Sequence, residues 1–367
     1  MSDRRLTAWW DDGTRIGHFS ERDDDAIDFE YADDYRGIPV SVSLPPGEKA
    51  APRAAANFLA NLLPESESAR SRIARRHGLD PNDNFGLLST IGRECAGALI
   101  LTPDDDTPPI LPGQYSALSD ADFERWLEMR EHQPLMTDRE GRVRLSLAGA
   151  QAKAALRFDE SDRPWLPLDG AASTHIVKPR ILRARPDTVH VEWFCMHLAA
   201  AMLADVDVAT TDLWRRCLRV KRFDRQITES GVRRVHQEDL CQALGLAPTA
   251  KYERVTDIDG PQDTLLARTT RLIDTLARAG RMPVPALVKR TLYRYLLVNA
   301  MLLNADAHLM NFALLHLPDG RMHLAPLYDV LCTEAIRMRA GNETGWEREP
   351  AREVRLESEL ALAIGKA

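Results

Sequence analysis

The chain has 367 residues, more than one compact core usually holds, so we expect two or three domains or lobes. Its 44% hydrophobic and 28% charged residues are ordinary for a globular protein, and a net charge of −7 argues against nonspecific nucleic-acid binding by the whole surface. The first ten residues lack the apolar stretch of a signal peptide, and the longest apolar run is too short to span a bilayer. The five cysteines form no CxxC pair, which favours free thiols. We therefore predict a cytoplasmic protein with no membrane interaction.

The first hundred residues are expected to form a small α+β unit. An Asp12-Gly13 turn between two strand-like segments is a strong hairpin signal. The patterns that follow predict, in order, a strand at 39–46, helices at 53–63 and 70–77, and a short strand at 94–101. The segment 102–113 contains four prolines and three consecutive acidic residues, which makes it the best candidate for a linker.

The rest of the chain passes from strands to helices. Two strands are predicted within 143–158, one at 174–179 and a pair within 213–223. Helices are predicted at 191–203, 263–279 and 285–304, and the pattern is mostly helical from residue 237 onward. Strands gathered before helices indicate an α+β fold, because a parallel doubly wound sheet would alternate βα units along the chain.

Three polar residues late in the sequence have the spacing of a phosphotransferase site. Asn311 follows Asp306 by five residues, the D-x-x-x-x-N spacing of a kinase catalytic loop, and Asp329 lies in the apolar segment LAPLYDVL. A carboxylate must accept the proton of the acceptor hydroxyl or orient that hydroxyl, while an amide can hold Mg²⁺ without adding charge. Asp329 needs a partner in apolar surroundings, and a divalent cation would supply one.

A kinase also needs a lysine for the ATP phosphates and a carboxylate that holds this lysine. Lys178 lies on a predicted strand, and Glu192 lies on the helix that follows. The segment around Gly149, with Ala148 and Ala150 beside it, has small residues that would let backbone N–H groups approach phosphates. It contains one glycine and does not match the G-x-G-x-x-G pattern.

Each of these residues, taken alone, also has a plain structural interpretation. Asp306 fits a helix cap and Asp329 fits a turn. Lys178 fits an exposed strand position, and Glu192 fits an acid favoured in the first turn of a helix. His308 fits an ordinary structural histidine, because the residues around it are mostly apolar.

Six ordered motifs resemble those of HipA-type kinases, the serine/threonine-kinase toxins of bacterial toxin–antitoxin pairs. The motifs are SLAGAQAK, THIVKP, VKRFDR, HQEDLCQALG, NADAHLMNF and APLYDV. Near the amino terminus, SVSLPP, NFLANLLPES and LLSTIGRECAGAL are similar to the amino-terminal subdomain of that family. The resemblance implies a two-lobed, protein-kinase-like fold with an extra α+β subdomain. It divides the chain into the subdomain at 1–104, the amino-terminal lobe at 105–223 and a mainly helical carboxy-terminal lobe at 224–367.

The resemblance also implies roles for individual residues. Asp306 would be the catalytic aspartate, and Asn311 and Asp329 would bind Mg²⁺. Ser146 would be an autophosphorylation site that expels its loop and switches the enzyme off. Glu192 would be the partner of the ATP-binding lysine. The ATP-binding set, with a hinge at 221–223 for the adenine and Asp224 near the ribose, would be Ala148, Gly149, Ala150, Gln151, Lys153, Lys178, Lys221, Arg222, Phe223, Asp224 and His308.

The cofactors implied are ATP and Mg²⁺, and the implied partners are a HipB-like helix-turn-helix antitoxin and, mainly through it, operator DNA. The implied substrate is a protein, such as an aminoacyl-tRNA synthetase. Only 38 residues follow Asp329, whereas relatives continue with further helices, so we expect a shortened carboxy-terminal lobe. This expectation keeps a second hypothesis open, in which an inactive relative only binds an antitoxin or its DNA complex. A small-molecule phosphotransferase is a third.

Overall fold

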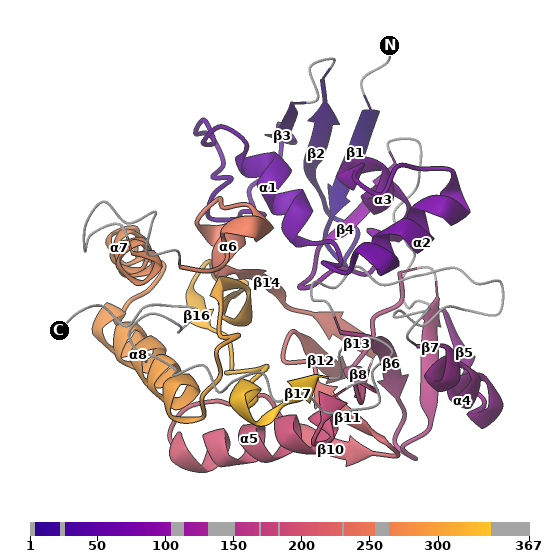
Figure 1. The fold of residues 1–367 in the computed structure, drawn as a ribbon. Coiled ribbons are helices and arrows are strands. Elements are labelled where there is room, and N and C mark those ends of the chain that lie inside the picture. Colours follow the sequence, from indigo (N-terminus) through magenta and orange to yellow (C-terminus); the bar gives the residue numbers. More distant parts are fainter. Residues whose placement is uncertain are drawn as a thin grey trace. The chain divides into compact units, whose positions relative to one another are not determined.

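The computed structural model describes residues 4–22, 26–103, 114–130, 151–168, 170–182, 184–229, 231–253 and 264–338. The chain forms two compact units (Figure 1). The first consists of Met1–Val177 and Arg222–Pro248, and the second of Lys178–Lys221 and Thr249–Ala367. The predictions for Ser146, Ala148, Gly149 and Ala150 lie outside the described residues. The functional division at 104 and 223 stays a prediction.

The first unit begins with an antiparallel sheet in the order β3-β2-β1-β4. Its strands are β1 (Arg4–Trp9), β2 (Arg15–Glu21), β3 (Ile27–Tyr31) and β4 (Ile100–Pro103). The predicted hairpin is confirmed, since Gly13 takes the left-handed φ of +84° and Asp12 Oδ1 accepts from the Thr14 backbone N at 2.9 Å. Helices pack with this sheet around one apolar core, and they are α1 (Ala54–Asn61), α2 (Glu67–His77) and α3 (Asn84–Ile91).

A second antiparallel set of strands follows in the same unit, in the order β8-β6-β7-β5. Its members are β5 (Gln114–Ala117), β6 (Ala154–Phe158), β7 (Pro164–Leu168) and β8 (His175–Pro179), with α4 (Asp120–Met129) after β5. The boundary between the two units falls inside β8. The unit is completed by β12 (Arg225–Thr228), β13 (Gly231–Arg234), β14 (His236–Asp239) and α6 (Leu240–Ala243).

The strand predicted at 39–46 is wrong. This segment forms turns with a single bridge between Ser41 and Leu44. Its polar groups bond to a distant part of the chain instead of a neighbouring strand: Ser41 Oγ donates to Glu238 Oε2 at 2.5 Å, and the Val42 backbone N donates to Glu238 Oε1 at 2.9 Å. A side chain from residue 238 therefore takes the place of a sheet partner.

The second unit contains the long helices. These are α5 (Thr188–Met202), α7 (Leu265–Arg278) and α8 (Pro285–Met301). Helix α5 packs on the hairpin of β10 (Thr211–Trp214) and β11 (Cys217–Lys221), while α7 packs against α8. The short elements are β9 (Ala184–Arg185), β15 (Ala313–His316), β16 (Met322–Leu324) and β17 (Arg337–Met338), with 3-10 turns η1 (Pro248–Ala250), η3 (Leu309–Asn311) and η4 (Thr333–Ala335).

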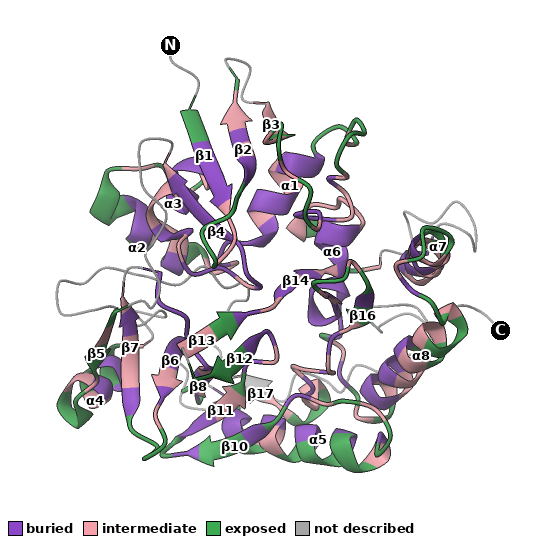
Figure 2. Ribbon diagram, turned by 180° about the vertical axis from the view of Figure 1, so that it is seen from behind, coloured by how far each residue is buried: buried purple, intermediate pink, exposed green. Residues whose placement is uncertain are grey.

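Burial follows the packing of these elements. Figure 2 shows buried stretches on β1, β2 and α1 and green, exposed stretches on the outer turns of α5 and α8. The predicted helices at 263–279 and 285–304 are confirmed to within a few residues. No helix in the described part of the chain has the length and apolar character needed to cross a membrane.

Candidate active site

The first part of the site lies where β8 ends and α5 begins. Asp187 caps α5, because its side chain accepts a hydrogen bond from the Val189 backbone N at 3.0 Å. Glu192 lies in the second turn with only 3% of its surface exposed. Its Oε1 is 2.8 Å from Nζ of Lys178, so the structure brings together the lysine and the helix carboxylate that the sequence predicts as partners.

The same ammonium group also bonds Oδ1 of Asp329. Burial lowers the pKa of Lys178, but the carboxylates of Asp329 and Glu192 raise the pKa by more than burial lowers it. The pKa of Lys178 therefore lies above its usual value. Burial and the nearby Asp329 charge raise the pKa of Glu192, and Lys178 offsets only part of this rise. One lysine thus serves two carboxylates, and the ionised group carries a net negative charge that a cation would balance.

Asp329 has an unusual backbone. Its φ is +59°, in the left-handed region, which residues other than glycine, asparagine and aspartate rarely enter. Such strain persists only where surrounding bonds hold it, and it gathers at functional sites. Here Asn304 Nδ2 donates to the Asp329 carbonyl at 3.3 Å, and the neighbouring Tyr328 hydroxyl donates to the Met310 carbonyl at 2.8 Å.

The loop with Asp306 follows α8 and is organised by two amides. The side chain of Asn304 is buried, and its Oδ1 accepts from the Asp306 backbone N at 3.2 Å. Asn311 Nδ2 donates to the Asp306 carbonyl at 2.9 Å, which closes the loop. Within the described ranges no residue donates to Oδ1 of this amide, so that oxygen could accept another ligand. Since Asn304 also bonds the Asp329 carbonyl, one side chain connects the two loops. Sequence reasoning missed Asn304, because its role depends on bonds to distant residues.

Tyr252 was also missed from the sequence. Its hydroxyl donates to Oδ1 of Asp306 at 2.6 Å, and its ring lies 5.1 Å from the ring of His308 in an edge-to-face arrangement. His308 Nε2 lies 4.0 Å from the same Asp306 oxygen. The residue follows Lys251 just after a 3-10 turn, a position with no motif that would have marked it.

The oxygen donors of this unit fit a hard divalent cation. Asp329 offers a carboxylate and Asn311 an amide oxygen, and Mg²⁺ binds through one or two protein oxygens with phosphates and water completing its octahedron. The described residues contain no cluster of three or more His, Cys, Asp or Glu that could hold a metal by themselves. A magnesium ion at these two residues would therefore depend on a bound phosphate.

The predicted hinge contains residues in different environments. Lys221 ends β11 and is exposed, and Phe223 is half-buried. Asp224 is 2% exposed, and its oxygens accept from Arg222 Nε at 2.9 Å and from the Gly97 backbone N at 2.8 Å. The assignment of Asp224 to the ribose stays a prediction, and these bonds would compete with it.

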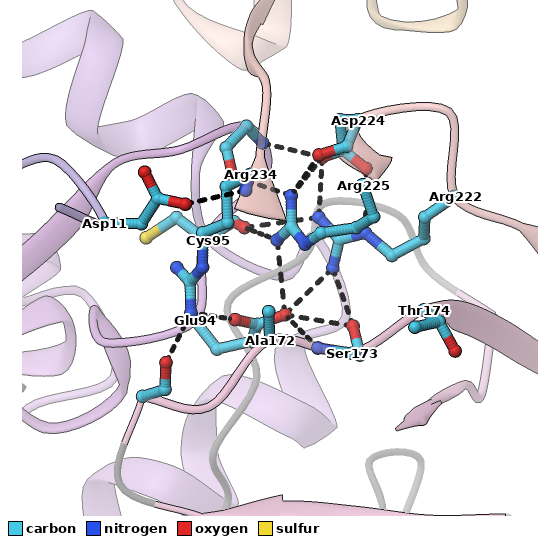
Figure 3. Close-up of polar contacts among 12 residues, drawn as sticks. Asp11, Glu94, Cys95, Ala172, Ser173, Thr174, Arg222, Asp224, Arg225 and Arg234 are labelled. Atoms are coloured by element: carbon cyan, nitrogen blue, oxygen red, sulfur yellow. Dashed lines mark hydrogen bonds and ion pairs between the residues drawn. The ribbon is translucent and has the colours of Figure 1, made fainter. Parts of the chain in front are cut away.

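Asp224 belongs to a buried ionic cluster in the first unit, drawn in Figure 3. We call it the arginine cluster, and its charged members are Glu94, Arg222, Asp224, Arg225 and Arg234. Glu94 Oε1 accepts from Arg222 at 3.1 Å and from Arg225 at 3.3 Å, while Oε2 lies 2.5 Å from Arg234. Burial raises the pKa of Glu94, but the three guanidinium groups lower the pKa by more than burial raises it. The pKa of Glu94 therefore lies below its usual value.

Two residues of the predicted phosphate loop are within the described chain. Gln151 is half-buried, and Lys153 is 7% exposed just before β6. Both lie in the first unit, and their assignment to ATP stays a prediction.

A strand lysine paired with a helix carboxylate, together with a D-x-x-x-x-N loop and a second aspartate, is the arrangement of protein kinases. The solved complex of the HipA toxin, HipB antitoxin and operator DNA of Shewanella oneidensis MR-1 matches with a TM-score of 0.71 and 27% identity, covering 90% of this chain and 76% of that chain. The chain therefore has an α+β fold of the protein-kinase-like class.

The sequence comparisons identify the family. The family model for the HipA-like C-terminal domain matches residues 145–366, and that for the HipA N-terminal domain matches residues 6–102. Y4mE of Sinorhizobium fredii, a protein named as a kinase, is 38% identical over 349 residues, covering 91% of this chain and 79% of its own. The serine/threonine-protein kinase toxin HipA of Shewanella oneidensis is 30% identical over 322 residues, covering 84% and 71%. The chain belongs to the HipA family of serine/threonine-kinase toxins.

Proposed function

We propose that this protein is an ATP- and Mg²⁺-dependent serine/threonine-protein kinase that acts as the toxin of a toxin–antitoxin pair. The observation that carries the proposal is the bonding of Lys178 to both Glu192 and Asp329 beside an ordered Asp306–Asn311 loop. Buried ionic groups of this kind are costly unless they are paired, and the excess negative charge suits a site for a cation and its phosphate ligand.

Each residue has a distinct task in this proposal. Lys178, positioned by Glu192, binds ATP phosphate oxygens, and Asp329 and Asn311 hold Mg²⁺, which supplies charge neutralisation at the phosphates. Asp306 orients the acceptor hydroxyl and accepts its proton as the phosphoryl group transfers. The remaining members of the predicted ATP set, including the hinge at 221–223, would hold the nucleotide.

The family also supports proposals for regulation and partners. We propose that Ser146 is autophosphorylated, that a HipB-like helix-turn-helix antitoxin binds this protein, and that operator DNA is bound mainly through the antitoxin. The solved Shewanella complex contains these partners of its own chain. The proposed substrate is a protein of translation such as an aminoacyl-tRNA synthetase, and the proposed location is the cytoplasm.

The central test is phosphoryl transfer by the purified protein with Mg²⁺ and ATP, followed by mass spectrometry of the protein and of added candidate substrates. Phosphate on Ser146 or on a substrate is expected. Asp306→Asn should reduce the rate by about 10²- to 10⁴-fold, because the amide cannot accept the proton. Asp319→Asn, at the exposed turn between β15 and β16, is the matched control and should retain the wild-type rate.

Calorimetric titration with Mg·ATP separates the alternatives. Binding with 1:1 stoichiometry that Asp329→Asn weakens would support the kinase. A folded protein that binds no Mg·ATP but forms a complex with its antitoxin would instead support the inactive, antitoxin-binding relative. Phosphorylation of small molecules but of no protein would favour the small-molecule phosphotransferase.

A further inference from the structure

The surroundings of the Asp306 carboxylate are asymmetric. Oδ1 accepts from the Tyr252 hydroxyl at 2.6 Å and is 4.0 Å from His308 Nε2. Within the described parts of the chain, no residue donates to Oδ2. The Asp306 side chain is 51% exposed, so this second oxygen can be reached from solvent. This arrangement suits a general base, because the bond to Oδ1 fixes the orientation of the carboxylate while Oδ2 can accept a proton.

The backbone of Tyr252 is held in place on both sides. The backbone on its amino-terminal side is fixed because the Lys251 carbonyl accepts from the Leu309 backbone N at 3.1 Å, at the start of η3. On its carboxy-terminal side, Glu253 Oε2 accepts from the Leu265 backbone N at 2.7 Å, in the first turn of α7. The segment 251–253 thus connects the catalytic loop to the helix α7.

The Tyr252 ring is fixed as well. The Lys251 ammonium lies 5.0 Å from the ring centroid, within the range of a cation–π contact, and the His308 ring meets it nearly at right angles. Yet 38% of Tyr252 is exposed. Core packing therefore does not explain its position, which agrees with these contacts and with the hydrogen bond to Asp306.

We propose that Tyr252 is a positioning residue for Asp306. Its phenol O–H holds Oδ1, so that Oδ2 faces the acceptor hydroxyl of the substrate and receives its proton. This inference rests on the proposed kinase function and adds a residue to it. A base that is misplaced by about 1 Å can lose about 10²-fold in rate, so the orientation of one carboxylate is a sufficient reason for such a residue.

The test is Tyr252→Phe, which removes the hydroxyl and keeps the ring contacts with Lys251 and His308. We expect kcat to fall by roughly 10- to 100-fold, while the Kd of Mg·ATP stays unchanged because Tyr252 acts only through Asp306. Rates are to be normalised to the number of Mg·ATP-binding sites, so that unfolded protein does not contribute. Tyr293→Phe is the matched control, since Tyr293 is an exposed tyrosine on α8 in the same unit, and it should behave as wild type.

A double-mutant cycle distinguishes a positioning role from general structural damage. If Tyr252 acts through Asp306, Tyr252→Phe should have no further effect on the residual rate of Asp306→Asn. A further loss in the Asp306→Asn background, or an unchanged kcat in Tyr252→Phe, would overturn the inference. If Asp306→Asn itself retains the wild-type rate, the proposed function fails, and this result is separate from the failure of the positioning role.

Discussion

Glu94 shows how much a single residue can matter in this fold. Its carboxylate is 3% exposed and is bonded by three arginines from a later part of the chain and by the Ser173 hydroxyl at 2.9 Å. The lowered pKa of Glu94 means that its stabilising contribution is present above the unfolded-state pKa and is lost as pH falls through the folded-state value. Salt should screen this pairing little, because the charges are buried.

Replacing Glu94 tests this pairing directly. Glu94→Gln keeps the shape but leaves Asp224 as the single carboxylate of the cluster for three buried guanidinium groups, and it leaves Arg234 without its carboxylate partner. We therefore expect the free energy of unfolding to fall by about 3–5 kcal/mol. Urea unfolding at neutral pH measures it. Glu128→Gln, at an exposed position on α4, should change stability by less than about 0.5 kcal/mol. Equal midpoints for both variants would contradict an energetic role for the arginine cluster.

The predicted pairing of Lys178 with Glu192 is present in the structure, because a strand followed by a helix brings the two together. The roles of Asp306 and Asn311, which depend on a local motif, stay predictions. Spacing was insufficient for Asn304, Tyr252 and Glu94. Their contacts include bonds to residues 25 to more than 100 positions away, which no local pattern encodes. The sequence therefore indicates residues proposed to act on a substrate and misses residues whose bonds connect distant parts of the chain.

Among the elements, the short helix α6 shows a local rule that the sequence does reveal. Asp239 is three residues before Gln242, the spacing of a capping box. Its side chain accepts from the Gln242 backbone N at 2.9 Å, while Gln242 Oε1 accepts from the Asp239 backbone N at 3.0 Å, so the reciprocal capping box is formed. Burial raises the pKa of Asp239 to about 7, and the charge of Glu238 adds to the rise.

The raised pKa predicts a pH-dependent stability. Between the ordinary pKa of 3.8 and the folded value of about 7, the folded state binds the proton more tightly, so the contribution of Asp239 to stability falls as pH rises through this window. Asp239→Asn keeps a capping oxygen and does not titrate. We expect the stability difference, wild type minus variant, to fall by more than about 1 kcal/mol between pH 4 and pH 8.

Urea midpoints for both proteins across this pH range would provide the measurement. Asp239→Ala is the companion variant, and loss of the cap should lower its stability by about 1 kcal/mol. A difference between wild type and Asp239→Asn that does not change with pH would show that this carboxylate is not perturbed.

Element prediction succeeded for long amphipathic segments and failed where tertiary bonds replaced regular structure. The helices at 263–279 and 285–304 have clear periodicity, and both are present. The segment 39–46 has the alternating pattern of a strand, but it forms turns, and its Ser41 hydroxyl bonds the Glu238 side chain. The expectation of a mostly helical half from residue 237 overlooked β14, β15 and β16, which are three or four residues long and too short to show periodicity.

On the scale of the whole molecule, the first unit is assembled from two separate stretches of sequence. Its amino-terminal apolar core lies entirely within residues 6–101. The polar bonds around that core, however, reach residues 222–248: the carbonyls of Gly245 and Leu246 accept from Asn57 and Asn61, each at 2.8 Å, and Glu238 bonds Ser41. The matched family region at 6–102 is thus incomplete as a structural piece.

Fragments test this dependence. We expect residues 1–103 to unfold cooperatively, since the apolar core is complete, but at a lower urea concentration than the same fragment joined by a Gly/Ser linker to residues 222–248. Each recovered hydrogen bond contributes about 1 kcal/mol. Identical midpoints would mean that the later segment adds nothing, and scrambling its sequence in the joined chain provides the control.

The left-handed backbone of Asp329 has a practical consequence for experiments on partners. An inactive variant for capturing a proposed antitoxin or substrate must lose the charge of the carboxylate proposed to bind Mg²⁺ but keep the loop. Alanine would add backbone strain of about 1 kcal/mol or more at a φ of +59°. That strain would disturb the Asp306 loop as well, because the Asn304 side chain bonds this loop to the Asp329 carbonyl. Asparagine tolerates this conformation and removes the charge. We therefore expect Asp329→Asn to lose activity while it preserves the surface that binds a partner.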